Sequence, residues 1–199
     1  MLCSTNCLSI QQQTWAGTLG SSQVNFQILK GTKELWLGYG AKTKVLQGYA
    51  DADGSMGEDQ KAISGYAFMI NGGAVSWSAK RQELISLLTT ESEYIVATYA
   101  AKEALWLRAL ISQLFGVQLN TTTLFSDNQL AIALTKEHQY HACTKHIDVH
   151  YHFIRWIIEE GKIKLIYCPT DEMVADALTK VLPSTKVKHF THKLGLVAN

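Results

Sequence analysis

Hydrophobic and polar positions follow two different periods along this chain, and the period changes near residue 88. Apolar or alternating runs at residues 44–51, 63–72 and 73–82 have the length and composition of β-strands. The letters "NGG" between the second and third runs predict a tight hairpin, because Asn and Gly tolerate positive φ. Short connections join the three strands, so we expect them to form an antiparallel meander.

The second part of the chain has mostly helical spacing. Residues 89–115 begin with threonines and acidic residues, carry apolar side chains at helical spacing and reach Gly116, so they predict one long helix. Two more strands are predicted at residues 121–127 and 162–168, and further helices at residues 128–136, 145–161 and 171–180. This order predicts an α/β fold: a mixed five-stranded sheet, three strands antiparallel and then two parallel, flanked by helices.

Composition narrows the possible classes of protein without choosing a function. The chain has 199 residues, 47% of them hydrophobic and 18% charged, which is enough for one sizeable core. A net charge of +1 gives no general attraction to nucleic acid, so any such binding needs a local basic face. The sequence contains no run of about 18 apolar residues, so we do not expect a membrane-spanning helix. The four cysteines show no C-x-x-C spacing, so we expect free thiols and an intracellular protein, in the cytoplasm or the nucleus.

Four acidic residues stand at positions where a soluble domain has little need of them. Asp51 ends the first predicted strand and Asp127 ends the fourth, and ligands gather at the carboxyl ends of neighbouring strands in such sheets. Glu93 and Asp176 lie on predicted helices among apolar residues, where an unpaired acid is costly. Together the four predict a carboxylate cluster that binds magnesium or manganese.

Nearby acids leave alternatives for two of these positions. Glu91 and Glu93 lie about 200° apart on a helix, so only one of them can face the site. Glu93 leads into an alanine-rich face, which favours it. Asp171 and Glu172 are the alternatives to Asp176, but they lie at the start of their predicted helix and suit capping.

The remaining alternatives concern the two strand ends. Asp51 and Asp53 share one face of a strand, but the chain turns at Gly54, so we expect Asp53 to lie in the loop. Asp127 is also placed to act as the N-cap of the helix that follows it.

Histidines and tryptophans offer two further hypotheses, of which one is disfavoured. His146 and His150 are four residues apart on a predicted helix, but no Cys or Glu completes a site, so zinc is not favoured. Trp77, Trp106 and Trp156 are expected in the core rather than as platforms for stacking bases.

Five motifs in a fixed order resemble the ribonuclease H portion of copia-type retrotransposon polyproteins. They are "LQGYADAD", "SGYAFMINGGAVSWSAKRQ", "TTESEYIVA", "FSDNQLAIAL" and the stretch "TKHIDVHYHFIRWIIEEGKIKLIYCPTDEMVADALTK". The resemblance runs from about Phe26 to Leu196. It implies a ribonuclease H domain at residues 44–182 and a C-terminal tail at residues 183–199.

The resemblance also bears on the start of the chain. Residues 24–43 resemble the connection that follows the polymerase domain in these polyproteins. Residues 1–23 do not match, and we expect them to form a disordered leader. We therefore expect a C-terminal fragment that lacks the polymerase domain.

The resemblance implies a reaction and its participants. The RNA strand of an RNA–DNA hybrid would be cut by two-metal, in-line hydrolysis that leaves a 3′-hydroxyl and a 5′-phosphate, with two Mg²⁺ or Mn²⁺ ions as cofactors. The family's four acids fall on Asp51, Glu93, Asp127 and Asp176, as catalytic and metal-binding residues. The implied partners are the hybrid and a polymerase domain or related polyprotein.

Five more residues are candidates for contact with the hybrid: Asp53, Ser126, Asn128, Lys145 and His146. Turn and helix-start chemistry is the alternative explanation for them. For the chain as a whole, the alternative is a non-catalytic, retrotransposon-derived module that binds nucleic acid or protein. An integrase-like DNA nuclease is disfavoured by the "SGY…VSW" hairpin.

Overall fold

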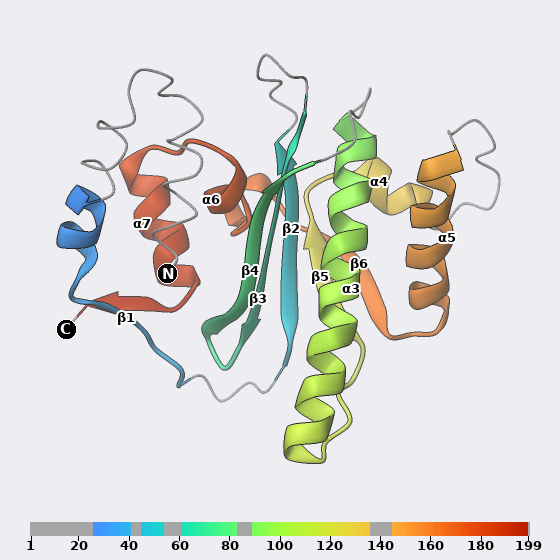
Figure 1. Ribbon diagram of the computed structural model, residues 1–199, viewed down its shortest axis with the longest axis horizontal. Helices are drawn as coiled ribbons and strands as arrows, with labels where there is room; N and C mark the ends of the chain where they lie inside the picture. The colour runs from blue at the N-terminus through green and yellow to red at the C-terminus, as the bar shows by residue number, and fades with distance from the viewer. Residues whose placement is uncertain (1–25, 41–44, 54–60, 83–88, 136–144, 199) are drawn as a thin grey trace.

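A five-stranded mixed sheet forms the centre of the structure (Figure 1). The computed structural model describes residues 26–40, 45–53, 61–82, 89–135 and 145–198. The strands, in the order in which they lie side by side, are β4 (Gly73–Arg81), β3 (Ile63–Ile70), β2 (Gln47–Asp53), β5 (Thr122–Ser126) and β6 (Ile163–Tyr167). Strands β2, β3 and β4 are antiparallel neighbours, whereas β5 runs parallel to β2 and β6 parallel to β5. This confirms the predicted mixed sheet.

The predicted hairpin joins β3 to β4 through two residues with positive φ. Asn71 has φ 53° and Gly72 has φ 85°. Such a turn has the backbone twist that matches the twist of the flanking strands. The "NGG" signal was therefore sufficient to locate it.

Helices cover both faces of the sheet (Figure 1). One face carries the long helix α3 (Thr89–Phe115) and α5 (Lys145–Glu159), with the short α4 (Gln129–Leu134) after β5. The other face carries α6 (Asp176–Thr179) and α7 (Ser184–Lys193). Alternation along β3 separates the two cores: Phe68 packs in the core on the α3 side, and Ala67 packs in the core that includes Leu178 and Leu194.

Small side chains bring α3 close to the sheet. Ala97, Ala100 and Ala104 are buried in the core below α3, at the spacing that keeps them on one helix face. Glu93 lies one turn before them and is buried as well. The alanine-rich face therefore directs Glu93 toward β2.

Two predictions about local structure were wrong. The helix predicted at residues 171–180 is divided into a 3₁₀ turn, η1 (Thr170–Glu172), and the single turn of α6. The division arises because Met173 has an extended backbone and packs with Cys168 in a small separate hydrophobic cluster.

The second wrong prediction concerns two tryptophans. Trp106 and Trp156, predicted in the core, are 56% and 49% exposed. The Lys162 ammonium lies 4.9 Å from the centre of the Trp156 ring, which is a cation–π contact at the surface. Trp77 does pack, partly buried, against the core on the α6 side.

The segments before and after the predicted domain pair with each other. Strand β1 (Leu35–Leu37) is antiparallel to β7 (Leu196–Ala198), and neither strand was predicted. The backbone N–H of Ala74 in β4 donates to the Leu194 carbonyl at 2.9 Å, which attaches this small sheet to the hairpin. Helix α7 and β7 therefore belong to the folded body. Among the described residues, no helix combines the length and the apolar character that crossing a membrane requires.

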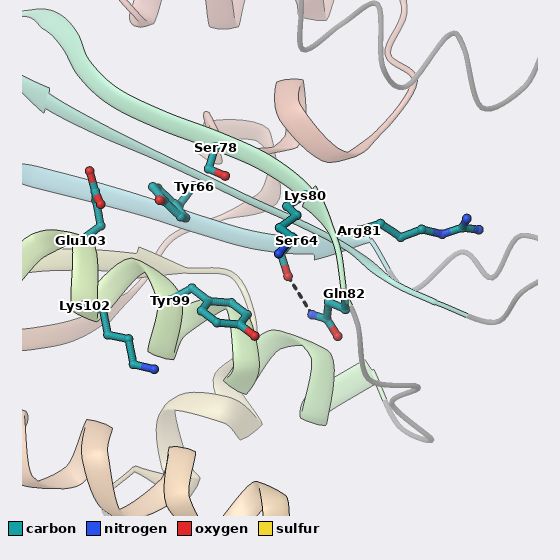
Figure 2. A pocket seen from close by; sticks show the side chains of 9 residues that line it. All are labelled: Ser64, Tyr66, Ser78, Lys80, Arg81, Gln82, Tyr99, Lys102 and Glu103. Carbon is teal, nitrogen blue, oxygen red and sulfur yellow. Dashed lines mark hydrogen bonds between the residues drawn. The ribbon is translucent and has the colours of Figure 1, made fainter.

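A pocket of about 330 Å³ lies between α3 and the strands β3 and β4 (Figure 2). Its lining residues are Ser64, Tyr66, Ser78, Lys80, Arg81, Gln82, Tyr99, Lys102 and Glu103. At one end, the Gln82 amide donates to the Ser64 hydroxyl at 2.8 Å and to the Ser92 carbonyl at 3.0 Å. Buried Gln82 thus ties the end of β4 to β3 and to the first turns of α3, immediately before Glu93.

Candidate metal centre

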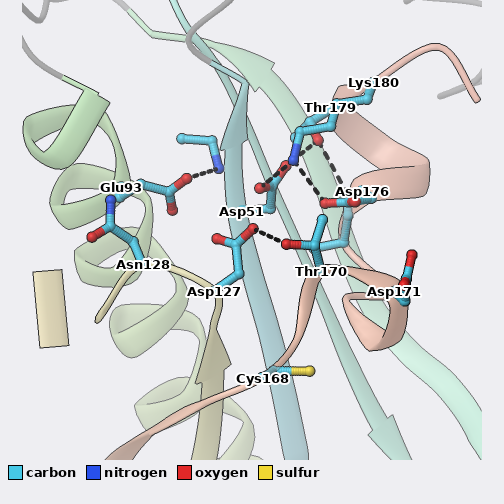
Figure 3. A network of polar contacts seen from close by, with 12 residues as sticks. Asp51, Glu93, Asp127, Asn128, Cys168, Thr170, Asp171, Asp176, Thr179 and Lys180 are labelled. Atoms are coloured by element: carbon cyan, nitrogen blue, oxygen red, sulfur yellow. Dashed lines mark hydrogen bonds and ion pairs between the residues drawn. The ribbon is translucent and has the colours of Figure 1, made fainter. Parts of the chain in front are cut away.

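Three carboxylates from separate elements meet at one edge of the sheet (Figure 3). Asp51 lies near the end of β2, and Asp127 follows β5 directly, so the parallel pairing of these strands brings the two acids to the same edge. Glu93 reaches them from α3. One oxygen of each of the three residues lies within 4.8 Å of the others.

Glu93 is the least satisfied member of this cluster. The residue is 4% exposed, and its Oε1 accepts one hydrogen bond, from the backbone N–H of Ala52 at 3.2 Å. Its Oε2 is buried and has no hydrogen-bond partner among the described residues. Burial and then the negative charges of Asp51 and Asp127 raise the Glu93 pKa to about 9. Glu91, the alternative on α3, is not part of the cluster.

Asp176 joins the site through a lysine (Figure 3). It is the first residue of α6 and is buried. The Lys180 Nζ lies 2.9 Å from Asp176 Oδ1 and 2.9 Å from Asp51 Oδ1. The Thr179 hydroxyl donates to the other oxygen of Asp51. Asp51 is therefore held at both oxygens by two consecutive residues.

Burial shifts the pKa of each of these three groups toward its neutral form, and neighbouring charges oppose or add to that shift. Burial raises the Asp51 pKa, although Lys180 and the Thr179 hydroxyl act to lower it. Burial and the Asp51 charge raise the Asp176 pKa to about 6. Burial acts to lower the Lys180 pKa, but the two aspartates outweigh it, so the pKa is raised and Lys180 is a cation at neutral pH.

A glycine on β3 allows α6 to approach Asp51. Gly65 is the residue paired with Asp51 across the β2–β3 ladder. A Cβ at this position would lie 2.6 Å from Thr179 Cγ2 and 3.0 Å from Leu178 Cβ. The absence of a side chain at Gly65 thus lets Thr179 and Lys180 reach the carboxylate.

Comparisons with known proteins identify relatives of this chain. No family model matches the chain. The chain is 41% identical over 173 residues to the retrovirus-related Pol polyprotein from transposon TNT 1-94 of Nicotiana tabacum, and 31% identical over 157 residues to that from transposon RE2 of Arabidopsis thaliana. Its homologues are retrovirus-related Pol polyproteins of plant transposons. The matches cover 86% and 78% of this chain but only 13% and 11% of the polyproteins, so the chain spans about an eighth of their length.

Solved structures confirm the fold of this Pol homologue. RNase H1 LC11, isolated from compost, superimposes with a TM-score of 0.51 at 16% identity, over 68% of this chain and 93% of that one. The N-terminal RNase H domain of Rv2228c from Mycobacterium tuberculosis gives a TM-score of 0.51 at 14% identity, over 75% of this chain and 98% of that one. The Pol homologue therefore has a ribonuclease H-like fold, as the resemblance implied.

Two expectations about the strand ends of this Pol homologue need correction. Asp53 does not lie in a loop: it is the last residue of β2, pairs with Ile63, and lines the cleft described below. The N-cap of α4 is Asn128, not Asp127, because the Asn128 Oδ1 accepts a hydrogen bond from the Ala131 N–H at 2.9 Å. Capping by Asn128 leaves the Asp127 carboxylate available to the cluster.

The other candidate substrate contacts differ in their surroundings. Ser126 is buried, and its hydroxyl accepts a hydrogen bond from the Asn128 N–H at 3.3 Å, which favours the turn role over contact with a substrate. Lys145 and His146 begin α5, but their side chains lie outside the described residues. Contact of these residues with a hybrid stays a prediction.

An open cleft of about 610 Å³ gives access to the carboxylates. Its lining residues are Ala52, Asp53, Thr89, Glu93, Asp127, Asn128, Gln129, Leu130, Tyr167 and Lys180. Thr170 contacts one of the lining residues, because its hydroxyl donates a hydrogen bond to Asp127 Oδ2 at 3.3 Å. Solvent and a ligand that enters this cleft can therefore reach Glu93, Asp127 and Lys180.

Sequence reasoning missed the residues that hold the acids in place. Lys180 carried a signal, since it follows Asp176 by four positions, the spacing of a helical ion pair. Thr179 and Gln82 carried none, because their partners lie far away in the sequence or on another element.

The donor set fits a hard divalent cation. Carboxylate oxygens are the ligands that Mg²⁺ and Mn²⁺ prefer, and the cluster supplies them from three elements. The unpaired, buried Oε2 of Glu93 is costly unless a cation or a donor satisfies it. The residues therefore fit a magnesium or manganese site.

Proposed function

We propose that this domain is a divalent-metal-dependent endonuclease that cleaves the RNA strand of RNA–DNA hybrids. The observation that carries the proposal is the cluster of Asp51, Glu93 and Asp127, with one oxygen of each within 4.8 Å of the others. The ribonuclease H-like fold of the chain supports it. A cleft that opens onto the cluster gives a nucleic-acid strand a place to lie.

Two Mg²⁺ or Mn²⁺ ions would be coordinated by the four acids, Asp51, Glu93, Asp127 and Asp176. Bound ions would lower the pKa of the attacking water and stabilise the leaving 3′ oxygen, so that the products carry a 3′-hydroxyl and a 5′-phosphate. Asp51 is the central ligand in this proposal, because it contacts both the Glu93 side and the Asp176 side of the site. Thr179 would orient Asp51 through its hydroxyl, and Gln82 would fix the first turns of α3 beside Glu93.

The setting of the domain is part of the proposal. The homologues are Pol polyproteins that are much longer than this chain, so we propose that a polymerase domain of such a polyprotein assists substrate binding. We also propose that the domain acts inside the cell, in the cytoplasm or the nucleus, where RNA–DNA hybrids are made.

The decisive experiment is cleavage of a labelled hybrid by the purified 199-residue chain. In Mg²⁺ or Mn²⁺, the RNA strand of the hybrid should be cut, single-stranded RNA and duplex DNA should not, and the new ends should be 5′-phosphate and 3′-hydroxyl. Asp127→Asn should abolish cleavage, because it removes a charged ligand from the open side of the cluster. Asp171→Asn, on an exposed aspartate of the same region, is the matched control.

A folded chain that binds neither metal and cuts nothing would contradict the proposal. Circular dichroism establishes folding, and calorimetric titration with Mn²⁺ establishes metal binding. That outcome would favour the alternative, a non-catalytic module that binds nucleic acid or protein.

A further inference from the structure

Lys180 places a positive charge inside the proposed metal centre. Its ammonium lies 2.9 Å from one oxygen of Asp51 and 2.9 Å from one oxygen of Asp176. We propose that Lys180 is a built-in counter-cation that competes with divalent metal for Asp51 and Asp176 and withdraws when metal binds between them. The inference rests on the proposed function, because it concerns the same carboxylates.

The two partners of Lys180 cannot move away from each other. The side chains of Asp51 and Asp176 are 1% and 4% exposed, and each is fixed in an element that packs on the other. Two buried carboxylates that both lie 2.9 Å from one ammonium repel each other unless a cation lies between them. The lysine supplies that cation from within the chain.

Lys180, in contrast, is free to leave. Its side chain is 29% exposed and lines the open cleft, so the ammonium can rotate into solvent on a flexible four-carbon stem. An ammonium is well hydrated in water, which limits the cost of that movement. The carboxylates thus stay in position while the lysine moves.

The position of Lys180 makes the two halves of the site unequal. The ion pairs of Lys180 in the described part of the chain are with Asp51 and Asp176, so an ion held by Glu93, Asp127 and Asp51 shares only Asp51 with the lysine and can leave it paired with Asp176. An ion bound between Asp51 and Asp176 meets the ammonium and requires it to leave. Metal binding at the second position is therefore weakened by the lysine.

The experiment compares Mn²⁺ binding by Lys180→Met, Lys180→Arg and the unchanged chain, with no nucleic acid present. Methionine keeps much of the stem and removes the charge. We expect Lys180→Met to bind Mn²⁺ at the weaker site about tenfold more tightly, which corresponds to about 1.4 kcal/mol. Its melting temperature in chelator should be lower than that of the unchanged chain, and added Mn²⁺ should largely remove the difference. Lys180→Arg keeps the charge and should bind Mn²⁺ no more tightly than the unchanged chain.

A matched control and a contrary result complete the test. Lys186→Met removes a lysine that pairs with exposed Asp171. This variant should change neither the affinity for Mn²⁺ nor the effect of added Mn²⁺ on the melting temperature. Equal or weaker Mn²⁺ binding by Lys180→Met would overturn the inference and leave the proposed function intact. If Lys180→Met does not fold, tighter Mn²⁺ binding by Lys180→Arg than by the unchanged chain would overturn it. Absence of Mn²⁺ binding by the unchanged chain would overturn both.

Discussion

The two halves of the carboxylate cluster differ in how completely the protein satisfies them. On the held side, Asp51 receives a hydroxyl hydrogen bond and an ammonium, and Asp176 shares that ammonium. On the open side, Glu93 is buried with one oxygen unpaired, and Asp127 is half-buried beside the cleft, with Thr170 as its partner. The same kind of side chain thus contributes to stability on one side and costs free energy on the other.

The difference separates what the fold needs from what a ligand needs. A buried carboxylate with bonds to both oxygens helps to fix α6 on the sheet, whatever its chemical role. A buried carboxylate oxygen without a partner, such as Glu93 Oε2, is a cost that structural reasons do not explain, and such costs occur where function requires them. The open side is therefore the stronger sign of a metal site, and the held side shows how the site is kept in shape without one.

The largest expected effect comes from substitution on the open side. Glu93→Gln should reduce metal-dependent cleavage of a hybrid by more than about 100-fold, since it removes a proposed ligand rather than one of its supporting groups. Because the Glu93 pKa is about 9, glutamine resembles the protonated acid present at neutral pH. Stability in chelator should therefore be maintained or increased, as urea denaturation would measure.

Asp51→Asn is the matched change on the held side. It should reduce cleavage by a similar factor, but it should also lower the free energy of unfolding in chelator by about 1–2 kcal/mol, because buried donors lose a charged acceptor while Lys180 can turn partly to solvent. Equal stability losses for the two variants would contradict the distinction between the halves.

The second expected effect comes from the glycine that lets the held side close. Gly65→Ala should lower the free energy of unfolding by about 1–3 kcal/mol, because the new Cβ meets the Thr179 side chain at 2.6 Å. Cleavage should fall too, since Thr179 and Lys180 are pushed from Asp51. Gly40→Ala is the control, because nothing lies within 4 Å of its Cβ position. Full activity of Gly65→Ala would show that the site does not depend on this approach.

The same comparison shows what the sequence could predict. The open side was accessible from the sequence pattern: Asp127 was predicted at the end of a strand and directly follows β5, and the alanine face of α3 directs Glu93, rather than Glu91, toward the sheet. The order of the strands along the chain and the hairpin followed from the hydrophobic period and the turn residues, which are local signals. A catalytic role for each acid stays a prediction.

The held side was not accessible in this way, because it depends on contacts between distant segments. Thr179 meets Asp51 across 128 positions, and no local pattern encodes that pairing. The break in the predicted helix before α6 arises because Met173 and Val174 pack into different cores, which overrides the helical spacing of residues 171–180. The exposed Trp106 and Trp156 show the reverse error, since apolar character alone does not establish burial.

The third expected effect is a pH dependence of stability on the open side. Glu93 binds its proton more tightly in the folded chain, with a pKa of about 9 against an ordinary 4.5, so the folded state holds more protons between these values. The stability present at low pH should then be lost as pH rises toward 9, with a slope on the order of 1 kcal/mol per pH unit in chelator. Asp176, with its pKa raised to about 6, adds the same sign below that pH.

Urea denaturation at a series of pH values between 5 and about 9 measures this slope. Glu93→Gln should flatten it, because the titrating group is gone, and saturating Mn²⁺ should flatten it as well, because metal binds the deprotonated form. A slope unchanged in Glu93→Gln would assign the pH dependence to other groups.

The smallest expected effect tests the alternative to Asp176 on the held side. Asp171 lies five positions earlier, its side chain is 83% exposed, and it pairs with Lys186 on α7 rather than with the cluster. Asp171→Asn should leave hybrid cleavage and Mn²⁺ affinity unchanged, since a solvated surface pair contributes little. Asp176→Asn should weaken both, because Lys180 then balances Asp51 alone and a proposed ligand of the second ion is lost. A loss of Mn²⁺ affinity in Asp171→Asn, with Asp176→Asn unaffected, would move the fourth carboxylate from α6 to the 3₁₀ turn and would remove Lys180 from the metal centre.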